Sequence, residues 1–143
     1  MKKILLFVLP VVLLSACGKH ETYVVGENAI CTGLEETSPE KVFCKDLDGN
    51  AISGLVVQKY ENGNIWREMT IKMGQENGIE KEYYENGNIK VYADIKNGNA
   101  IGESELYHEN GKLHMVIKWN GEDAEIVEIH DENGKLLEQQ PED

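Results

Sequence analysis

The sequence lacks the short motifs that mark the common classes of enzyme and metal site. It contains no nucleophile elbow, no phosphate-binding loop and no zinc-binding motif. The segment Asp46-Leu47-Asp48-Gly49-Asn50 is a poor fragment of a calcium loop, which needs alternating oxygen ligands and a closing glutamate. We therefore expect no catalytic residues, no metal and no cofactor, and we predict that the chain is not an enzyme.

Positive charge is also scarce. The 143 residues hold 14 Lys and Arg against 26 Asp and Glu, a formal net charge of −12. Such an excess of carboxylates repels nucleic acid and anionic lipid headgroups, and it speeds encounters with basic partners. We therefore expect no nucleic-acid partner and favour a protein partner with a basic surface. An acidic surface that serves only solubility is the alternative.

The first apolar run, residues 4–14, is too short for a membrane-spanning helix. It has 11 residues, whereas a helix needs about 20 to cross the hydrocarbon core of a bilayer. Lys2 and Lys3 precede the run, and the small residues Ser15 and Ala16 follow it, which is the pattern of a secretory signal. We predict a signal peptide over residues 1–16.

Residues 14–17, Leu-Ser-Ala-Cys, resemble the lipobox of bacterial lipoproteins. The resemblance implies cleavage before Cys17, attachment of lipid (palmitate among the acyl chains) at that residue, and localisation in the cell envelope. Two or three acyl chains anchor a protein stably, because each buried CH₂ contributes about 0.8 kcal/mol. Gly18 rather than Asp follows Cys17, which in a diderm host implies the outer membrane, on its periplasmic side or its surface. We predict a lipidated tether over residues 17–28.

After Cys17 the chain has only two cysteines, Cys31 and Cys44. An even number of cysteines in an exported chain favours a disulfide. Two thiols make half of a zinc site at best, and their spacing is far from the Cys-x-x-Cys of a redox pair. Ser38 is expected to cap a short helix that begins at Pro39. We predict that residues 29–47 form a capping segment closed by the Cys31–Cys44 disulfide.

From Asp48 onward the sequence repeats itself. The segment Tyr60–Ile65 recurs at 84–89 and, altered, at 108–113 and 131–136, with spacings of 24, 24 and 23 residues. The turn residues of these four units are Asn62-Gly63, Asn86-Gly87, Asn110-Gly111 and Asn133-Gly134. A second turn series lies between them, at Asp48-Gly49, Asn77-Gly78 (or Gly74), Asn97-Gly98 and Asn120-Gly121. Asn-Gly tolerates the positive φ of a type I′ hairpin turn, and turns this frequent leave room only for short strands. The pattern predicts an antiparallel meander.

Alternation after each main turn gives one mainly apolar face. It reads Ile65, Arg67, Met69, Ile71, then Ile89, Val91, Ala93, Ile95, then Leu113, Met115, Ile117, Trp119. A two-residue loop, which we favour, pairs Tyr60 with Ile65 on that face. A three-residue turn with a glycine bulge would instead turn Tyr83 and Tyr107 inward. The strands before the turns, with Glu80-Lys81-Glu82 and Glu103-Ser104-Glu105, are polar enough to predict exposure on both faces.

Five aromatic and histidine side chains are candidate site residues. Trp66 and Tyr92 lie on the polar face of successive repeats, where they would stack on sugars or fill a partner's pocket. Packing of the two against the capping segment is an equal alternative. His108, His114 and His130 fall in three different columns of the repeat. We therefore interpret the histidines as substituted repeat positions rather than metal ligands or a catalytic pair.

The repeated segments resemble the MORN-repeat variant family, in which a Tyr-x-Asn-Gly turn and an upstream glycine recur about every 23 residues. The resemblance covers residues 48–138 and implies an all-β fold, an elongated antiparallel meander of repeated β-hairpins after the disulfide-stapled segment. His108 and Asp131 replace the tyrosine, and Glu125 replaces the upstream glycine of the last unit. That unit is expected to be a degenerate cap, followed by an acidic tail over residues 139–143.

The resemblance also sets the expected function. Some bacterial members of this family are labelled as antitoxin components and others as lipoproteins, and eukaryotic MORN proteins are linked to membranes and scaffolding. We expect a membrane-anchored envelope lipoprotein whose repeats bind a protein, with an antitoxin or immunity role as the sharpest version. An envelope glycan- or lipid-associated scaffolding lipoprotein is the alternative, because a shared fold does not fix an activity.

Overall fold

The computed structural model describes residues 21–34 and 41–140, and these form eleven strands and no helix. The strands are β1 (Thr22–Val24), β2 (Ile30–Thr32), β3 (Phe43–Lys45), β4 (Gly54–Lys59), β5 (Ile65–Lys72), β6 (Gln75–Tyr83), β7 (Ile89–Lys96), β8 (Asn99–Tyr107), β9 (Leu113–Asn120), β10 (Asp123–His130) and β11 (Leu136–Gln139). The predicted signal peptide, Cys17 and the helix start at Pro39 lie outside the described residues. Nothing in residues 21–34 or 41–140 forms a helix long and apolar enough to cross a membrane.

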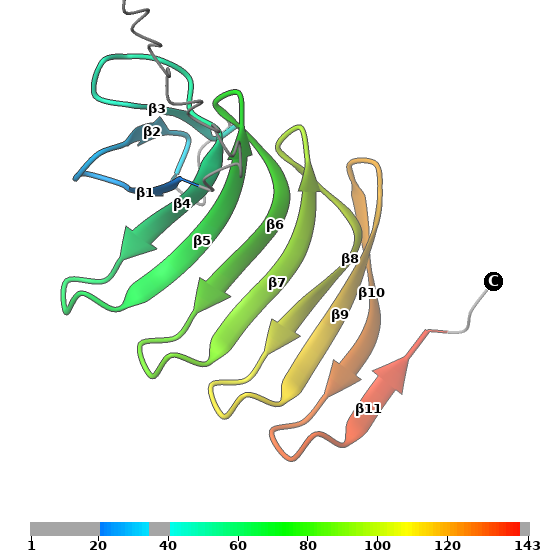
Figure 1. Cartoon of the computed structure of the whole chain (residues 1–143). Coiled ribbons are helices and arrows are strands. Elements are labelled where there is room, and N and C mark those ends of the chain that lie inside the picture. Colours follow the sequence, from blue (N-terminus) through cyan, green and yellow to red (C-terminus); the bar gives the residue numbers. More distant parts are fainter. Residues whose placement is uncertain (1–20, 35–40, 141–143) are drawn as a thin grey trace, which may run out of the picture.

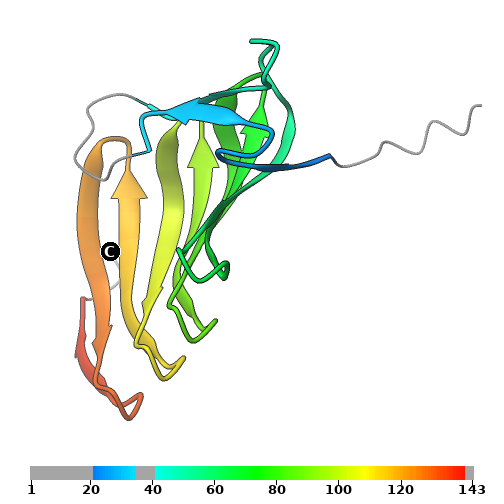
Figure 2. The same ribbon diagram turned by 90° about the vertical axis from the view of Figure 1, so that its left-hand side faces the viewer.

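Strands β4 to β11 follow one another in chain order as a single curved sheet (Figures 1 and 2). Every neighbouring pair in this series is antiparallel. The predicted all-β meander of hairpins is therefore confirmed. Strand β1 extends the sheet at the β4 edge in parallel, with Thr22 opposite Leu55. The ordered sheet thus begins inside the segment that was expected to be a tether.

The main turns differ from the two-residue loops that the sequence favoured. At the first turn the Tyr60 N–H donates to the Asn64 carbonyl, and the Gly63 N–H donates to the Tyr60 carbonyl. Gly63 has a φ of 88°, so the loop is a type I turn closed by a glycine bulge, with three residues between Tyr60 and Asn64. Lys59, not Tyr60, stands opposite Ile65. The prediction of a type I′ turn here was wrong.

A register shift follows each main turn and moves the first residue of the next strand to the other face. In β5 it falls between the pairs Lys59–Ile65 and Gln58–Arg67, so Ile65 faces away from Arg67. The same shift makes Ile89 and Leu113 the partners of Tyr83 and Tyr107. The alternation of the sequence predicts Ile65, Ile89 and Leu113 on the apolar face; this prediction is wrong, because the bulge turns them to the other face.

The opposite edge of the sheet does carry two-residue turns. Lys72 stands opposite Gln75, with Met73 and Gly74 between them at φ values of 52° and 85°. Two successive positive φ values are those of a type I′ turn. The turn is thus at Gly74 rather than at Asn77-Gly78. Gly78 lies inside β6 at a φ of 132°, where an added Cβ would come 2.9 Å from the Thr70 side chain.

The core lies between the N-terminal segment and one face of β4 and β5. Its buried residues are Ala29, Val42, Cys44, Ile52, Val56, Met69 and Ile71. We call the face of Val56 and Met69 the inner face, and the opposite one the outer face. The Cys31–Cys44 disulfide is confirmed: it joins the paired strands β2 and β3 with an S–S distance of 2.02 Å. Closing a loop of this size stabilises the fold by about 3 kcal/mol in the chain-entropy model.

Candidate functional site

The turn edge is held by hydrogen bonds that run from each repeat to the next. The Tyr60 hydroxyl donates to the Tyr83 carbonyl at 2.6 Å, and the Tyr84 hydroxyl donates to the Tyr107 carbonyl at 2.7 Å. His108 continues the series, with Nε2 3.1 Å from the His130 carbonyl oxygen. The repeated tyrosine is therefore a structural donor, and histidine replaces it with the bond retained.

Asparagine side chains add a second set of links along the same edge. The Asn64 amide donates to the Glu85 carbonyl at 3.1 Å, and the Asn88 amide donates to the Glu109 carbonyl at 2.8 Å. Lys112 replaces this asparagine in the third unit, and its Nζ donates to the Asn133 carbonyl at 2.9 Å. Each link fixes a turn on its neighbour, so the edge of the sheet is a rigid row of similar loops.

The two candidate binding aromatics lie in separate surroundings. Trp66 packs on Tyr60, with ring centroids 6.4 Å apart, at the bulge after the first turn. Tyr92 lies in the outer-face row opposite Lys81 and Glu105, with the Lys81 ammonium 6.0 Å from its ring centroid. Neither residue belongs to the described core that the N-terminal segment forms. The structure therefore gives no shared aromatic strip.

The three histidines are closer together than their repeat columns implied. The His108 and His114 ring centroids are 4.2 Å apart, and His108 bonds to the backbone of His130 as described above. His130 Nε2 is 2.9 Å from a Glu128 carboxylate oxygen. The turn and its bulge bring residues six apart into contact, as they do for Tyr60 and Trp66. Among the described residues, however, no group of three or more His, Cys, Asp or Glu is arranged to hold a metal ion.

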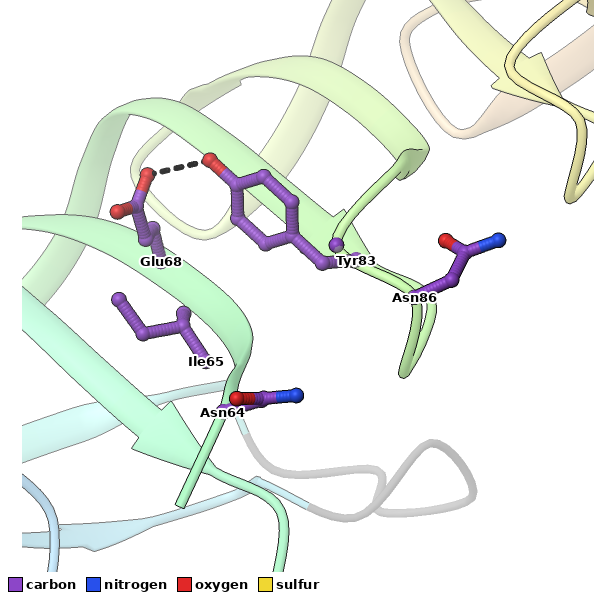
Figure 3. A pocket seen from close by; sticks show the side chains of 6 residues that line it. Asn64, Ile65, Glu68, Tyr83 and Asn86 are labelled. Atoms are coloured by element: carbon purple, nitrogen blue, oxygen red, sulfur yellow. Dashed lines mark hydrogen bonds between the residues drawn. The ribbon is translucent and has the colours of Figure 1, made fainter. Parts of the chain in front are cut away.

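A shallow hollow of about 440 Å³ lies beside the first two turns, between β5 and the end of β6 (Figure 3). Ile65 and the amides of Asn64 and Asn86 line it, and the Tyr83 hydroxyl donates to Glu68 at 2.8 Å. Burial and this hydrogen bond raise the pKa of Tyr83 to about 12. The phenol therefore stays protonated at neutral pH and is neither a base nor a nucleophile.

A charged cluster that no sequence motif predicts lies on the inner face. Glu76, Glu80 and Glu82 all point to this face of β6, and their side chains are only 5%, 13% and 13% exposed. Arg67 of β5 donates from Nε to Glu80 at 2.5 Å, and its guanidinium lies 3.7 Å from Glu76. The prediction that β6 is exposed on both faces is therefore wrong. The same prediction for β8 is also wrong at Ser104, which is only 4% exposed.

The inner-face cluster carries more carboxylates than nearby cations. Burial, and secondarily the Glu80 carboxylate, raises the pKa of Glu76 to about 7 against the opposing effect of Arg67. Burial also raises the pKa of Glu80. Glu76 Oε1 accepts no hydrogen bond from any described residue. The one sequence signal was that Glu76, Glu80 and Glu82 all have the same parity in β6, because side chains at even spacings share a face.

The comparisons with known proteins agree with the repeat pattern. Residues 53–73, 76–97 and 101–119 match the MORN repeat variant family. No match was found among curated proteins or among solved structures. The matched segments cover the hairpins from β4 to β9, and the last hairpin, β10–β11, keeps the same turn hydrogen bonds at Asp131 and Gly134. MORN repeats are a non-enzymatic repeat module, and residues 53–119 of this chain are three repeats of the MORN repeat variant family.

Proposed function

We propose that this chain is an envelope lipoprotein, anchored through Cys17, whose repeat sheet binds another protein without catalysing a reaction. The single observation that supports binding most directly is the largely uncovered end of the sheet at β10 and β11. Its strands are tied together by the turn-edge hydrogen bonds, and apolar side chains such as Ile126 and Leu137 are 43% and 61% exposed. A rigid, open surface of this kind suits recognition.

The charge of the chain points to a basic partner. The predicted signal contributes two of the 14 basic residues and none of the acidic ones, so the mature charge is 12 − 26 = −14. Opposite charge on the partner would speed association and select against acidic competitors. An antitoxin or immunity protein that covers a basic toxin is the sharpest version of this proposal. The glycan-binding alternative gains no support from Trp66 and Tyr92, because they lie in separate surroundings.

Cross-linking in intact cells tests the binding role. The full-length chain is tagged, cross-linked, extracted in mild detergent and purified, and co-purifying proteins are identified by mass spectrometry. We expect one stable protein partner whose recovery without cross-linker falls as the salt concentration rises. Recovery of the chain alone, with and without cross-linker, would count against a binding module.

Metabolic labelling tests the anchor separately. Cells are fed an alkyne-tagged palmitate, and the chain is examined for the label and for membrane association. We expect both in the wild type and neither in Cys17→Ser. A labelled or membrane-bound Cys17→Ser variant would place the anchor elsewhere and contradict this part of the proposal.

A further inference from the structure

A groove of about 570 Å³ lies on the outer face over β8 to β11. Leu113, Val116 and Val127 line it, and Val116 is only 8% exposed. Four glutamates also line it, namely Glu103, Glu105, Glu125 and Glu128. The groove therefore combines an aliphatic floor with walls of carboxylate.

Strand pairing fixes where the four carboxylates stand. Glu103 and Glu125 lie on either side of Lys118 in one cross-strand row. Glu105 and Glu128 lie on either side of Val116 in another. Neighbouring strands are about 4.8 Å apart and alternate residues on a regular strand are about 7 Å apart. Glu125 and Glu128 are three residues apart, but the irregularity between Ile126 and Glu128 sets them opposite Lys118 and Val116, which are alternate residues on β9. The Cα atoms of the four glutamates thus mark the corners of a rectangle of about 7 by 10 Å, with Val116 and Lys118 between them.

Two of these carboxylates are held in place by neighbours. The Tyr107 hydroxyl donates to Glu105, and His130 Nε2 lies 2.9 Å from Glu128. Lys118 is exposed, and no ion pair joins it to a carboxylate within the described residues. Four carboxylates and one ammonium leave a net charge of −3 around the aliphatic floor.

We propose that this groove binds lysine or arginine side chains of an extended basic segment in the partner protein. The aliphatic stem of such a side chain covers Val116 and its neighbours, while the cationic head reaches the carboxylates. The aliphatic floor gives no advantage to a small inorganic cation. This inference rests on the proposed protein-binding function and adds the place and the chemistry of the contact.

Fluorescence anisotropy with the full-length protein in mild detergent tests the groove. The probe is a fluorescein-labelled ten-residue peptide of alternating Lys and Thr, measured in buffer with salt near physiological strength. We expect Glu103→Gln with Glu125→Gln to weaken binding by about tenfold, since two charge-assisted contacts are lost. The matched control, Glu61→Gln with Glu85→Gln, removes the same charge at the exposed turn edge and is expected to change affinity by less than about twofold.

Lys118 gives a test in the opposite direction. If its ammonium competes with the incoming side chain, Lys118→Gln strengthens binding of the same peptide several-fold. Lys96→Gln, an exposed lysine on β7, changes the net charge equally and is expected to have little effect. If Lys118→Gln and Lys96→Gln have equal effects, or if the two glutamate pairs do, the peptide is attracted by the overall charge of the protein. Either result would overturn the proposal that the groove is the binding site.

The peptide itself tests the aliphatic floor. Replacement of each Lys by 2,4-diaminobutyrate keeps the charge and shortens the stem, and we expect weaker binding. Unchanged affinity, or no binding of either peptide by the wild type, would overturn the proposal. If cross-linking still captures a partner in that case, the binding function stands and only its location on this groove is rejected.

Discussion

The two ends of the sheet differ in what covers them. At β4 and β5 the N-terminal segment buries Val56 and Met69 completely and leaves Ile71 only 2% exposed. At β10 and β11 the apolar side chains of Ile126 and Leu136 remain 43% exposed. The repeats are similar in backbone at both ends, so the repeat alone does not make a core. The covered end holds the buried apolar core, and the open end is the surface that we propose for binding.

Arg67→Met gives the largest expected effect on this comparison. Met115 occupies the position of Arg67 two repeats later, where its partners are Leu106 and Ile129. At the covered end the same methionine would leave Glu76 and Glu80 without their cation, at a cost of about 3–5 kcal/mol, while Glu82 keeps Lys90 at 3.4 Å. Urea unfolding at pH 8 measures the loss. A change below about 1 kcal/mol would mean that the charged cluster does not need its arginine.

Met69→Ala tests the core directly. Removing a fully buried methionine side chain costs about 2–5 kcal/mol, because transfer energy is lost and a cavity is left. Ile126→Ala at the open end, where the side chain already contacts water, is expected to cost less than about 1 kcal/mol. The difference between the two unfolding free energies measures the contrast. Equal costs would show that the open end is buried by something outside the described fold.

Glu76→Gln tests whether the buried carboxyl at the covered end makes the stability of the fold depend on pH. The folded-state pKa of Glu76 is about 7 against an ordinary value of 4.5, so protonation favours the folded state. Its contribution is present below about pH 4.5 and is lost as the pH rises through 7, a difference of up to about 3 kcal/mol. We expect Glu76→Gln to be more stable than the wild type at pH 8 and to flatten its pH dependence. The exposed control Glu122→Gln is expected to leave the profile unchanged, and thermal unfolding from pH 4 to 8 provides the measurement.

Tyr84→Phe gives the smallest expected effect. It removes the hydroxyl that donates to the Tyr107 carbonyl, and one such hydrogen bond contributes about 1 kcal/mol. Tyr92→Phe, at a position that makes no repeat-to-repeat bond of this series, is expected to be neutral. The readout is hydrogen exchange of the amides in β7 and β8. Equal protection in the two variants would show that the tyrosine series does not hold the repeats together.

The sequence was sufficient for the architecture because its signals are local. Asn-Gly turns, alternating strands and two cysteines predict a disulfide-stapled meander without knowledge of distant contacts. The face of the sheet on which the Ile65 side chain lies could not be predicted in the same way. Whether the loop has two or three residues depends on backbone geometry that Asn-Gly permits in both cases, and one residue of difference turns the strand over.

The charged inner cluster escaped prediction for another reason. Glu80-Lys81-Glu82 is locally typical of an exposed strand, and its burial depends on Arg67 and on the neighbouring strands that flank it. The groove on the outer face is equally non-local, since its carboxylates come from β8 and β10 with β9 between them. Neither site is marked by a motif within one strand.

The tyrosine series also gives the chain a direction of assembly. Each hydroxyl donor finds its acceptor only 23 residues later in the sequence, so a unit leaving the ribosome stays incomplete until the following one has been made. Asp131 ends the series: backbone N–H groups of Lys135 and Asn133 bond to its carboxylate and lower its pKa, which keeps it without a proton to donate. Within the described residues, the donors of this series are therefore Tyr60, Tyr84 and His108, and the Asp131 side chain does not extend it.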